Sequence, residues 1–229
     1  MKLDNIEHVF FDLDHTLWDF DKNSELAFRE VFEKQNIRLN VDDFLQVYKP
    51  INFKYWELYR NNSVSKEALR YGRLKESFNA LQFETVDTTI NLIADDYIEY
   101  LPKNNHLLEG GMEILNILKD RYKLHIITNG FEEVQQKKMM GSGIHEFFET
   151  ITTSEEAGVK KPHPQIFQVA IDKSGAEIAK SVMIGDNLEA DIIGAHQFGL
   201  KVIHLGSGDQ SIQDQYPQVQ KLNELLNYL

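Results

Sequence analysis

The chain contains no cysteine among its 229 residues, and it has no long apolar run. The absence of cysteine excludes disulfide bonds and thiolate metal sites, and it agrees with a reducing cytoplasm. No apolar stretch approaches the roughly 20 residues that a membrane-spanning helix needs. The first residues carry Asp4 and Glu7 and lead straight into an apolar run, so we expect no cleaved signal peptide. We therefore expect a cytoplasmic protein without a membrane partner.

Basic residues are also few, with 24 Lys and Arg against 36 Asp and Glu, which gives a formal net charge of −12. Because nucleic acids are held mainly by Lys and Arg, this balance argues against a nucleic-acid polymer as partner. A small phosphate ester remains possible, since it needs only local positive charge. The 42% hydrophobic content is typical of a globular chain with a sizeable core.

Short apolar runs alternate with helical patterns over much of the chain, which predicts an α/β fold with a Rossmann-like parallel sheet. The expected strands are Ile6–Phe11, Leu124–Thr128, Val182–Ile184 and Val202–Leu205, with a further one around Phe148–Thr152. The expected helices between them are Met112–Asp120, Glu132–Met140, Pro164–Lys173 and Leu188–Phe198.

The interval 19–106 contains no convincing strand and is too long for one crossover. It shows amphipathic helical patterns at Ser24–Lys34, Asp42–Lys49, Ser65–Phe78 and near Thr88–Tyr100, and Pro50, Asn61-Asn62 and Pro102 punctuate it. We expect an inserted all-helical cap domain over 19–106 and a core domain over 1–18 and 107–229. The connections near Leu17–Asp21 and Asn104–Gly111 would then act as hinges of a lid.

Two acids, Asp12 and Asp14, follow the first apolar run directly. Ligands in open α/β sheets bind beyond the carboxyl ends of the strands. Two carboxylates this close repel each other unless one is protonated or a cation lies between them. The pair therefore suits a carboxylate nucleophile beside a proton donor with a divalent metal. A strand followed by an acidic turn explains this segment alone equally well.

Three later segments carry further polar groups. Thr128-Asn129-Gly130 ends an apolar run and offers donors for a phosphate, although a capped turn explains the same residues. Lys160 and Lys161 precede Pro162, where either lysine alone could be a solvated surface charge. Asp186 and Asp191 follow another apolar run, and Asp191 is also compatible with an ordinary acid in the first turn of a helix.

Together, and in this order, these segments resemble the four motifs of the haloacid dehalogenase superfamily, most of whose members are phosphatases. The resemblance implies that Asp12 is the nucleophile, which forms an aspartyl-phosphate, and that Asp14 is the general acid and base. Dehalogenases of the superfamily lack the second Asp, so Asp14 points away from carbon–halogen cleavage. One branch of the superfamily carries a helical cap between its first and second motifs.

The resemblance also implies roles for the other segments. The metal would be held by the Asp12 side chain, the backbone carbonyl of Asp14 and Asp186, with Asp191 and Asn187 in support. Thr128, Asn129, Gly130 and Lys161 would bind the phosphate, the lysine being selected because it stands directly before the proline.

The donor types favour Mg²⁺ as the cofactor. Four carboxylates would converge with only Lys161 clearly opposing them, and oxygen ligands with phosphate chemistry suit Mg²⁺ better than zinc. His15, His163 and His204 show no ligand spacing, and we interpret each as structural or peripheral.

A narrower resemblance concerns the substrate. Ile126–Phe131, Ser154–Pro162 and the pair Gly72-Arg73 are similar to bacterial pyrimidine 5′-nucleotidases, which implies a nucleoside monophosphate as substrate. In the cap, an aromatic of Tyr55–Tyr59 could stack on a base and Arg73 could contact a polar group. Aromatics that seal a small helical core and a surface Arg are the competing interpretation.

Three alternatives stay open: a phosphatase of sugar or small organic phosphates, a phosphomutase, and a non-catalytic binding protein on the same fold. We expect a monomer or weak homodimer.

Overall fold

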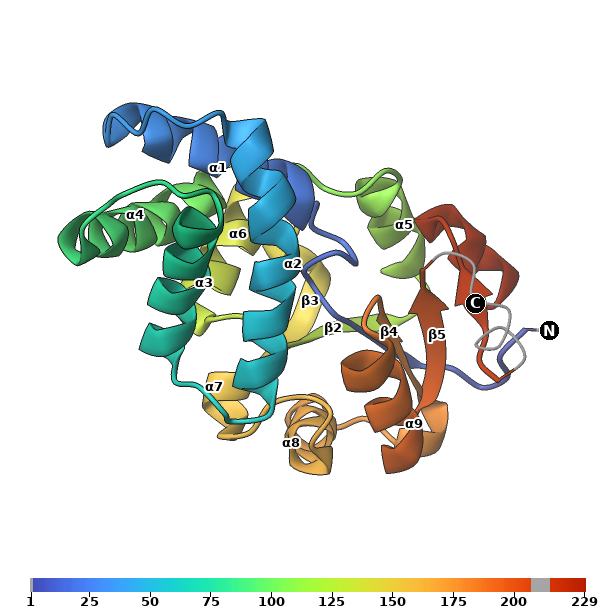
Figure 1. Ribbon diagram of the computed structural model, residues 1–229. Helices are drawn as coiled ribbons and strands as arrows, with labels where there is room; N and C mark the ends of the chain where they lie inside the picture. The colour runs from blue at the N-terminus through green and yellow to red at the C-terminus, as the bar shows by residue number, and fades with distance from the viewer. Residues whose placement is uncertain (1, 207–214) are drawn as a thin grey trace. The chain divides into compact units, whose positions relative to one another are not determined.

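The computed structural model describes residues 2–206 and 215–229 (Figure 1). The chain divides into two compact units. The core unit comprises Met1–Phe20 and Asn105–Leu229, and the cap unit comprises Asp21–Asn104. Within the described ranges, every helix is too short or too polar to cross a bilayer.

The core unit is built on one parallel sheet in the order β3-β2-β1-β4-β5-β6, which confirms the expected α/β fold with its helical insertion. The chain starts in the middle of the sheet at β1, moves outward through β2 and β3, and returns to the other side of β1 with β4. Ligands of open α/β sheets bind at such a switch point, beyond the carboxyl ends of the strands. The strands are β1 (His8–Phe11), β2 (Lys123–Thr128), β3 (Phe148–Thr153), β4 (Ser181–Gly185), β5 (Lys201–Leu205) and β6 (Gln218–Val219).

The helical segments of the core unit lie between these strands, except the last of them, which follows β6. They are α5 (Gly111–Leu118), α6 (Glu132–Gly141), η2 (His145–Phe147), α7 (Ser154–Ala157), α8 (Pro164–Ser174), η3 (Ile178–Lys180), η4 (Leu188–Ile193), α9 (Gly194–Phe198) and η5 (Leu222–Asn227). The expected single helix Leu188–Phe198 is wrong in detail, because η4 is wound more widely than the α-helix α9 that continues it. Single wide turns of this kind are frequent at functional sites.

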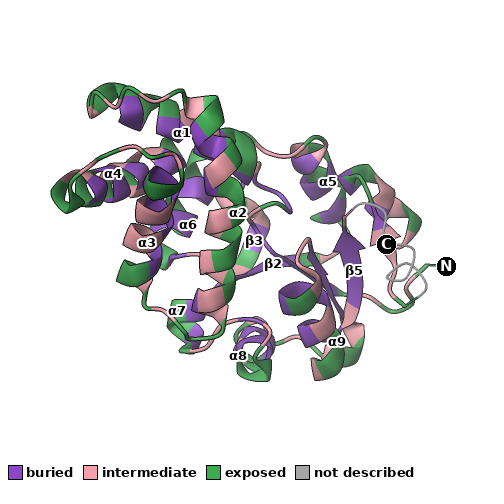
Figure 2. Ribbon diagram, in the orientation of Figure 1, coloured by how far each residue is buried: buried purple, intermediate pink, exposed green. Residues whose placement is uncertain are grey.

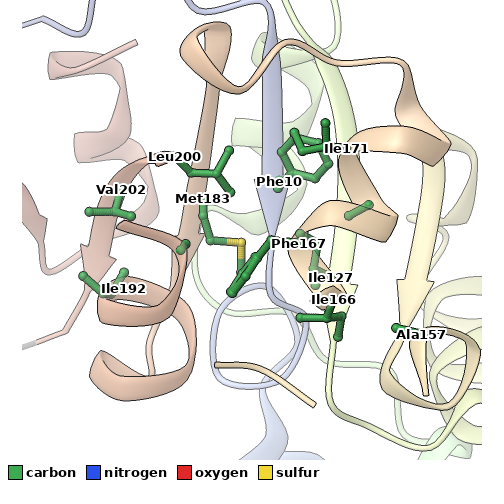
Figure 3. Close-up of a cluster of buried hydrophobic side chains, with 12 residues drawn as sticks. Phe10, Ile127, Ala157, Ile166, Phe167, Ile171, Met183, Ile192, Leu200 and Val202 are labelled. Carbon is green, nitrogen blue, oxygen red and sulfur yellow. The ribbon is translucent and has the colours of Figure 1, made fainter. Parts of the chain in front are cut away.

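Apolar residues in register across the sheet form the core. Phe10 pairs with Met183, and Met183 pairs with Val202, so the three side chains share one face. Figure 3 shows this face beneath α8, which contributes Ile166 and Phe167 to the same buried cluster. Each such fully buried side chain contributes about 1.5–3 kcal/mol. β1 and β4 are buried throughout, and β2 and β5 are buried beyond their first residue (Figure 2), as continuous apolar runs predict.

One polar pair interrupts this apolar interior. His8 Nδ1 lies 3.0 Å from His125 Nε2, and His125 Nδ1 lies 2.9 Å from Thr150 Oγ1. The His125 ring also stacks on Phe10, with ring centroids 4.7 Å apart. Burial, and to a lesser degree the charges of His8 and Lys123, lowers the pKa of His125 to about 3. Burial, and to a lesser degree the charge of Lys123, also lowers the pKa of His8. The fold therefore disfavours protonation of both imidazoles, that of His125 most strongly.

The cap unit is all-helical, and one of its helices runs through a proline. Its helices are α1 (Phe20–Lys34), α2 (Val41–Arg60), α3 (Lys66–Ala80), α4 (Asp87–Tyr100) and the short η1 (Leu101–Lys103). The expected end of α2 before Pro50 is wrong. Pro50 deprives the Gln46 carbonyl of its partner, but both residues are exposed, so water can replace the lost bond. Burial of Phe44, Leu45 and Tyr48 favours a continuous helix.

Aromatic side chains fill the centre of the cap unit. Phe28 stacks on Tyr97 with centroids 4.3 Å apart and meets Phe44 edge-on at 4.9 Å. Phe44 in turn packs against Phe78 at 5.4 Å. The helices of the cap unit carry buried stripes with exposed outer faces (Figure 2). This cluster supplies the cap unit with a hydrophobic core of its own.

Candidate active site

The ends of three adjacent strands bring the predicted residues together. Asp12 follows β1, Thr128 is the last residue of β2, and Asp186 follows β4. The backbone N–H of Asp12 donates to Ile184 O at 2.9 Å, which extends the pairing of β1 with β4 by one residue. The first Asp is therefore held by the sheet itself.

Lys161 is the central cation of the site. Its ammonium donates to Asp12 Oδ1 and to the carbonyl of Ile127, both at 2.6 Å, and it forms an ion pair with Asp191 Oδ1 at 2.7 Å. The Asp191 contact lacks hydrogen-bond alignment. Burial alone would lower the pKa of Lys161, but the carboxylates of Asp12 and Asp191 raise it above its usual value. Lys161 therefore stays charged although its side chain is only 2% exposed.

Three carboxylates crowd around this single ammonium. Ligand oxygens of Asp12, Asp186 and Asp191 all lie within 4.8 Å of one another. Burial and the neighbouring acids raise the pKa of Asp12, and they raise the pKa of Asp186 to about 7. Asp12 Oδ2 has no partner among the described residues. An oxygen-only site with surplus negative charge fits a hard divalent cation such as Mg²⁺, which would stabilise the ionised carboxylates.

The segment after β4 is shaped around Asp191. A Cβ on Gly185 would lie within 2.5 Å of the Asp191 side chain, so glycine leaves the space that this carboxylate occupies. The backbone N–H of Asn187 donates to Asp191 Oδ2 at 3.0 Å. The Asn187 side chain accepts from the backbone N–H of Ala190 and so caps η4. Asn187 is thus engaged within the protein, and its support of the metal site, which the resemblance implies, stays a prediction.

Thr16 and His204, which are not among the predicted site residues, fix Asp186. Thr16 donates its hydroxyl to Asp186 Oδ1 at 3.1 Å. His204 Nε2 lies 2.9 Å from the carbonyl oxygen of Asp186, so this nitrogen carries the proton. His204 is structural, as expected, and so is His163, whose Nδ1 accepts from Gln165 N and caps α8. His15 is exposed and packs against Phe20.

The Thr128-Asn129-Gly130 segment is already organised by hydrogen bonds. Thr128 Oγ1 accepts from Gln135 Nε2 at 2.8 Å and from Gly130 N at 3.1 Å. Its hydroxyl proton therefore remains available, and it has no acceptor among the described residues. Asn129 uses both ends of its amide on the backbone of Lys161, at 2.9 Å and 2.8 Å. Of the two side chains, Thr128 is the one with a free donor.

Asp14 is held apart from the three clustered acids. Its Oδ1 lies 2.6 Å from the ammonium of Lys138, and its Oδ2 accepts from Gln135 Nε2 at 3.0 Å. Its carboxylate is not among the oxygens that lie within 4.8 Å of one another. The expectation of four carboxylates opposed by Lys161 alone is therefore wrong, because Lys138 supplies a second buried cation. Gln135 and Lys138 are one helical turn apart on α6, a spacing that could have marked them as neighbours.

Arg73 is buried within the cap unit, not exposed on its surface. It donates to Asn52 Oδ1 at 2.8 Å, and its guanidinium carbon lies 5.2 Å from the centre of the Tyr97 ring. No carboxylate of the described residues pairs with it, and its Nε has no partner there. Tyr55 packs tightly over Gly72, where a Cβ would lie 2.4 Å from the ring. Tyr55 is thus partly explained by cap packing.

Comparisons with known proteins agree with this architecture. Pyrimidine 5′-nucleotidase YjjG of Escherichia coli is 30% identical over 200 residues, which cover 87% of this chain and 85% of that protein. Glyceraldehyde 3-phosphate phosphatase of Pyrococcus abyssi is 32% identical over 200 residues, which cover 86% of this chain and 80% of that protein.

A solved structure is similar over the whole length. The HAD-hydrolase YfnB of Bacillus subtilis, bound to magnesium, superposes with a TM-score of 0.86 and 29% identity over 97% of this chain and 98% of that chain. The model of the haloacid dehalogenase-like hydrolase family matches residues 6–199. A match over most of the chain, together with these relatives, shows that this protein belongs to the haloacid dehalogenase-like hydrolases.

Proposed function

We propose that the protein is a Mg²⁺-dependent phosphomonoester hydrolase that acts through an aspartyl-phosphate, with a nucleoside 5′-monophosphate as its substrate. The observation that carries the proposal is the position of Lys161. It lies between Asp12 and Asp191, and Asp12 Oδ2 is left without a partner among the described residues. A carboxylate with one oxygen fixed by a cation and the other free is suited to attack on phosphorus.

In the first step, Asp12 attacks phosphorus and the bond from phosphorus to the ester oxygen breaks. Asp14, in its acid form, gives its proton to the leaving oxygen, which departs as an alcohol, and Lys138 balances the charge of the carboxylate that remains. Thr128 can donate its free hydroxyl proton to a phosphoryl oxygen, because Gln135 and Gly130 already occupy the lone pairs on Thr128 Oγ1. Lys161 balances the negative charge that gathers around Asp12.

In the second step, water attacks the phosphorus of the aspartyl-phosphate. Asp14 takes a proton from that water, the bond from phosphorus to Asp12 breaks, and inorganic phosphate leaves. Both residues then return to their starting states, so no further reactant is needed.

Mg²⁺ would be held by the side chains of Asp12 and Asp186 and by the backbone carbonyl of Asp14, with Asp191 in support. When bound, it supplies positive charge that lets a phosphate dianion approach several acids. Thr16 and His204 fix Asp186 for this task. The magnesium bound to YfnB supports the choice of metal.

The nucleotide substrate is supported by the similarity to YjjG. It is also supported by the resemblance of Ile126–Phe131 and Ser154–Pro162 to pyrimidine 5′-nucleotidases. The similarity to glyceraldehyde 3-phosphate phosphatases favours a second candidate, the hydrolysis of small sugar phosphates. The core residues would contact the phosphate group of either substrate. Residues of the cap unit would therefore determine whether a nucleotide or a sugar phosphate is accepted. The connections near Leu17–Asp21 and Asn104–Gly111 remain our proposed hinges, and interdomain movement in YfnB supports them.

The test is a substrate panel of nucleoside monophosphates, sugar phosphates and small organic phosphates, assayed with Mg²⁺ and with EDTA. We expect phosphate release that is highest for pyrimidine nucleotides, lost in EDTA and restored by Mg²⁺. The variant Asp12→Asn should remain folded and inactive, and full activity in that variant would refute the nucleophile.

Water labelled with ¹⁸O separates a hydrolase from a mutase. A hydrolase incorporates one solvent oxygen into each phosphate that it releases, whereas a mutase returns the phosphoryl group to a sugar hydroxyl. The absence of turnover across the whole panel would favour a non-catalytic binding protein.

A further inference from the structure

A buried lysine outside the four motifs is attached to the second Asp of the site. Lys138 lies on α6, its side chain is only 3% exposed, and its ammonium lies 2.6 Å from Asp14 Oδ1. Burying an ammonium is unfavourable unless a charge or polar group compensates it. Asp14 is the carboxylate that forms this ion pair.

Aromatic rings surround the same ammonium. Lys138 Nζ lies 4.3 Å from the centre of the Trp18 ring and 5.4 Å from that of Phe20. Both distances are short enough for a cation–π attraction. The ring faces restrict where the ammonium can sit, so the carboxylate that it binds is restricted as well.

Gln135 holds the other oxygen of the same carboxylate. Its Nε2 donates to Asp14 Oδ2 at 3.0 Å and to Thr128 Oγ1 at 2.8 Å. A Cβ on Gly130 would lie 2.3 Å from this nitrogen, so the glycine leaves room for Gln135. Both oxygens of Asp14 are therefore fixed from α6, one by a cation and one by an amide.

We infer that Lys138 and Gln135 are positioning residues, which set the place and direction of the Asp14 carboxylate for proton transfer. They keep this carboxylate out of the cluster of Asp12, Asp186 and Asp191, which leaves the backbone carbonyl of Asp14 as its only group for the metal. The inference rests on the proposed function, because it assigns Lys138 to a step that Asp14 performs.

The consequence depends on the leaving group. An alkoxide must receive a proton as it departs, whereas p-nitrophenolate is stable enough to leave without one. A misplaced Asp14 should therefore slow the hydrolysis of alkyl phosphates much more than that of p-nitrophenyl phosphate. The ratio kcat/KM reports the step in which the ester bond breaks, so it is the quantity to measure.

The experiment compares Lys138→Met, Lys138→Arg and Lys137→Met with the unmodified protein. Lys137 is the neighbouring exposed lysine on α6 and serves as the matched control. We expect Lys138→Met to lower kcat/KM for a nucleoside monophosphate by about 100-fold, the lower end of a general-acid contribution, and that for p-nitrophenyl phosphate by about threefold or less. Lys138→Arg should retain most of the kcat/KM that Lys138→Met loses. Lys137→Met should change kcat/KM for neither substrate.

A double variant tests whether Lys138 acts through Asp14. In an Asp14→Asn background, Lys138→Met should lower kcat/KM little further, because the carboxylate that Lys138 positions is already lost. Additive losses, or equal losses for both substrates, would overturn the inference and indicate a general structural role or direct phosphate binding. Gln135→Leu supplies the same comparison if Lys138→Met does not fold.

The single variant Asp14→Asn distinguishes failure of the proton-transfer role of Asp14 from failure of the positioning role of Lys138 and Gln135. If Asp14→Asn shows no dependence on the leaving group, the proton-transfer role in the proposed function fails. If Asp14→Asn shows that dependence and neither Lys138→Met nor Gln135→Leu does, only the positioning inference fails.

Discussion

Asn129 and Lys161 are joined by two hydrogen bonds between the amide side chain of one and the backbone of the other. Asn129 Nδ2 donates to the carbonyl of Lys161 at 2.9 Å, and the backbone N–H of Lys161 donates to Asn129 Oδ1 at 2.8 Å. The loop that carries the central lysine is thereby attached to the end of β2. The segment that carries Lys161 is thus positioned by the Thr128-Asn129-Gly130 segment.

The first prediction concerns this attachment. Asn129→Ala removes both hydrogen bonds and should lower kcat by about 10- to 100-fold for every substrate, because Lys161 loses its fixed approach to Asp12. Asn129→Asp keeps the acceptor but turns a carboxylate oxygen toward the Lys161 carbonyl, so it should not restore the activity. Steady-state kinetics on two unrelated phosphate esters measure this, and a change confined to one substrate would contradict it.

The second prediction concerns the crowded acids. Without metal, the carboxylate of Asp186 stands beside that of Asp191, and burial has already raised its pKa to about 7. Asp186→Asn removes this repulsion, so it should stabilise the metal-free protein near neutral pH by on the order of 1–2 kcal/mol. The same variant should abolish the rise in Tm that Mg²⁺ causes in the unmodified protein.

Thermal melts in EDTA and in Mg²⁺ measure both effects. A variant that is less stable in EDTA would show that the hydrogen bond from Thr16 outweighs the repulsion. Glu189→Gln, which changes an exposed acid nearby, is the control and should keep the response to Mg²⁺.

The third prediction concerns the buried His8–His125 pair. In the unfolded chain His125 binds a proton below its usual pKa near 6.5, whereas in the fold it resists protonation down to about 3. The unfolded state therefore binds more protons in this window, and stability must fall as the pH is lowered through it. The expected loss from His125 is about 2 kcal/mol between pH ~7.5 and pH ~5.

His125→Gln retains polar side-chain atoms and does not titrate, so its stability should depend less on pH by about that amount. Urea unfolding at the two pH values measures the difference, and the titration of other acids cancels in the comparison. An equal slope in both proteins would show that His125 keeps its proton in the folded state.

Features that are local in the sequence could be predicted. Asp12, Thr128 and Asp186 each stand at the end of an apolar run, and parallel strands bring such ends together at one edge of the sheet. The structure does place them there, with Lys161 between Asp12 and Asp191. The π-like winding of η4 and the two-residue strand β6 have no such local pattern, so neither was expected.

Contacts that depend on tertiary packing could not be predicted. The local sequence predicts Lys138 to be an exposed surface lysine. No residue near it in the sequence indicates that Trp18 and Asp14 contact its ammonium. Arg73 likewise reads as exposed, yet it is buried among aromatic rings of the cap unit. Long polar side chains are poor guides from sequence, since their burial depends on partners far along the chain.

The last prediction concerns Arg73, whose guanidinium is buried without a carboxylate partner among the described residues. An unpaired buried charge costs stability, so Arg73→Met, which keeps much of the volume, should leave the Tm unchanged or raise it. If the free Nε contacts a polar group of the substrate, the same variant should lower kcat/KM for nucleotides relative to p-nitrophenyl phosphate by about 10-fold. Lys161→Met, by contrast, should depress turnover of every ester. A falling Tm with unchanged substrate ratios would instead assign Arg73 to the cap core, where its contacts with Asn52 and Tyr97 would be its whole role.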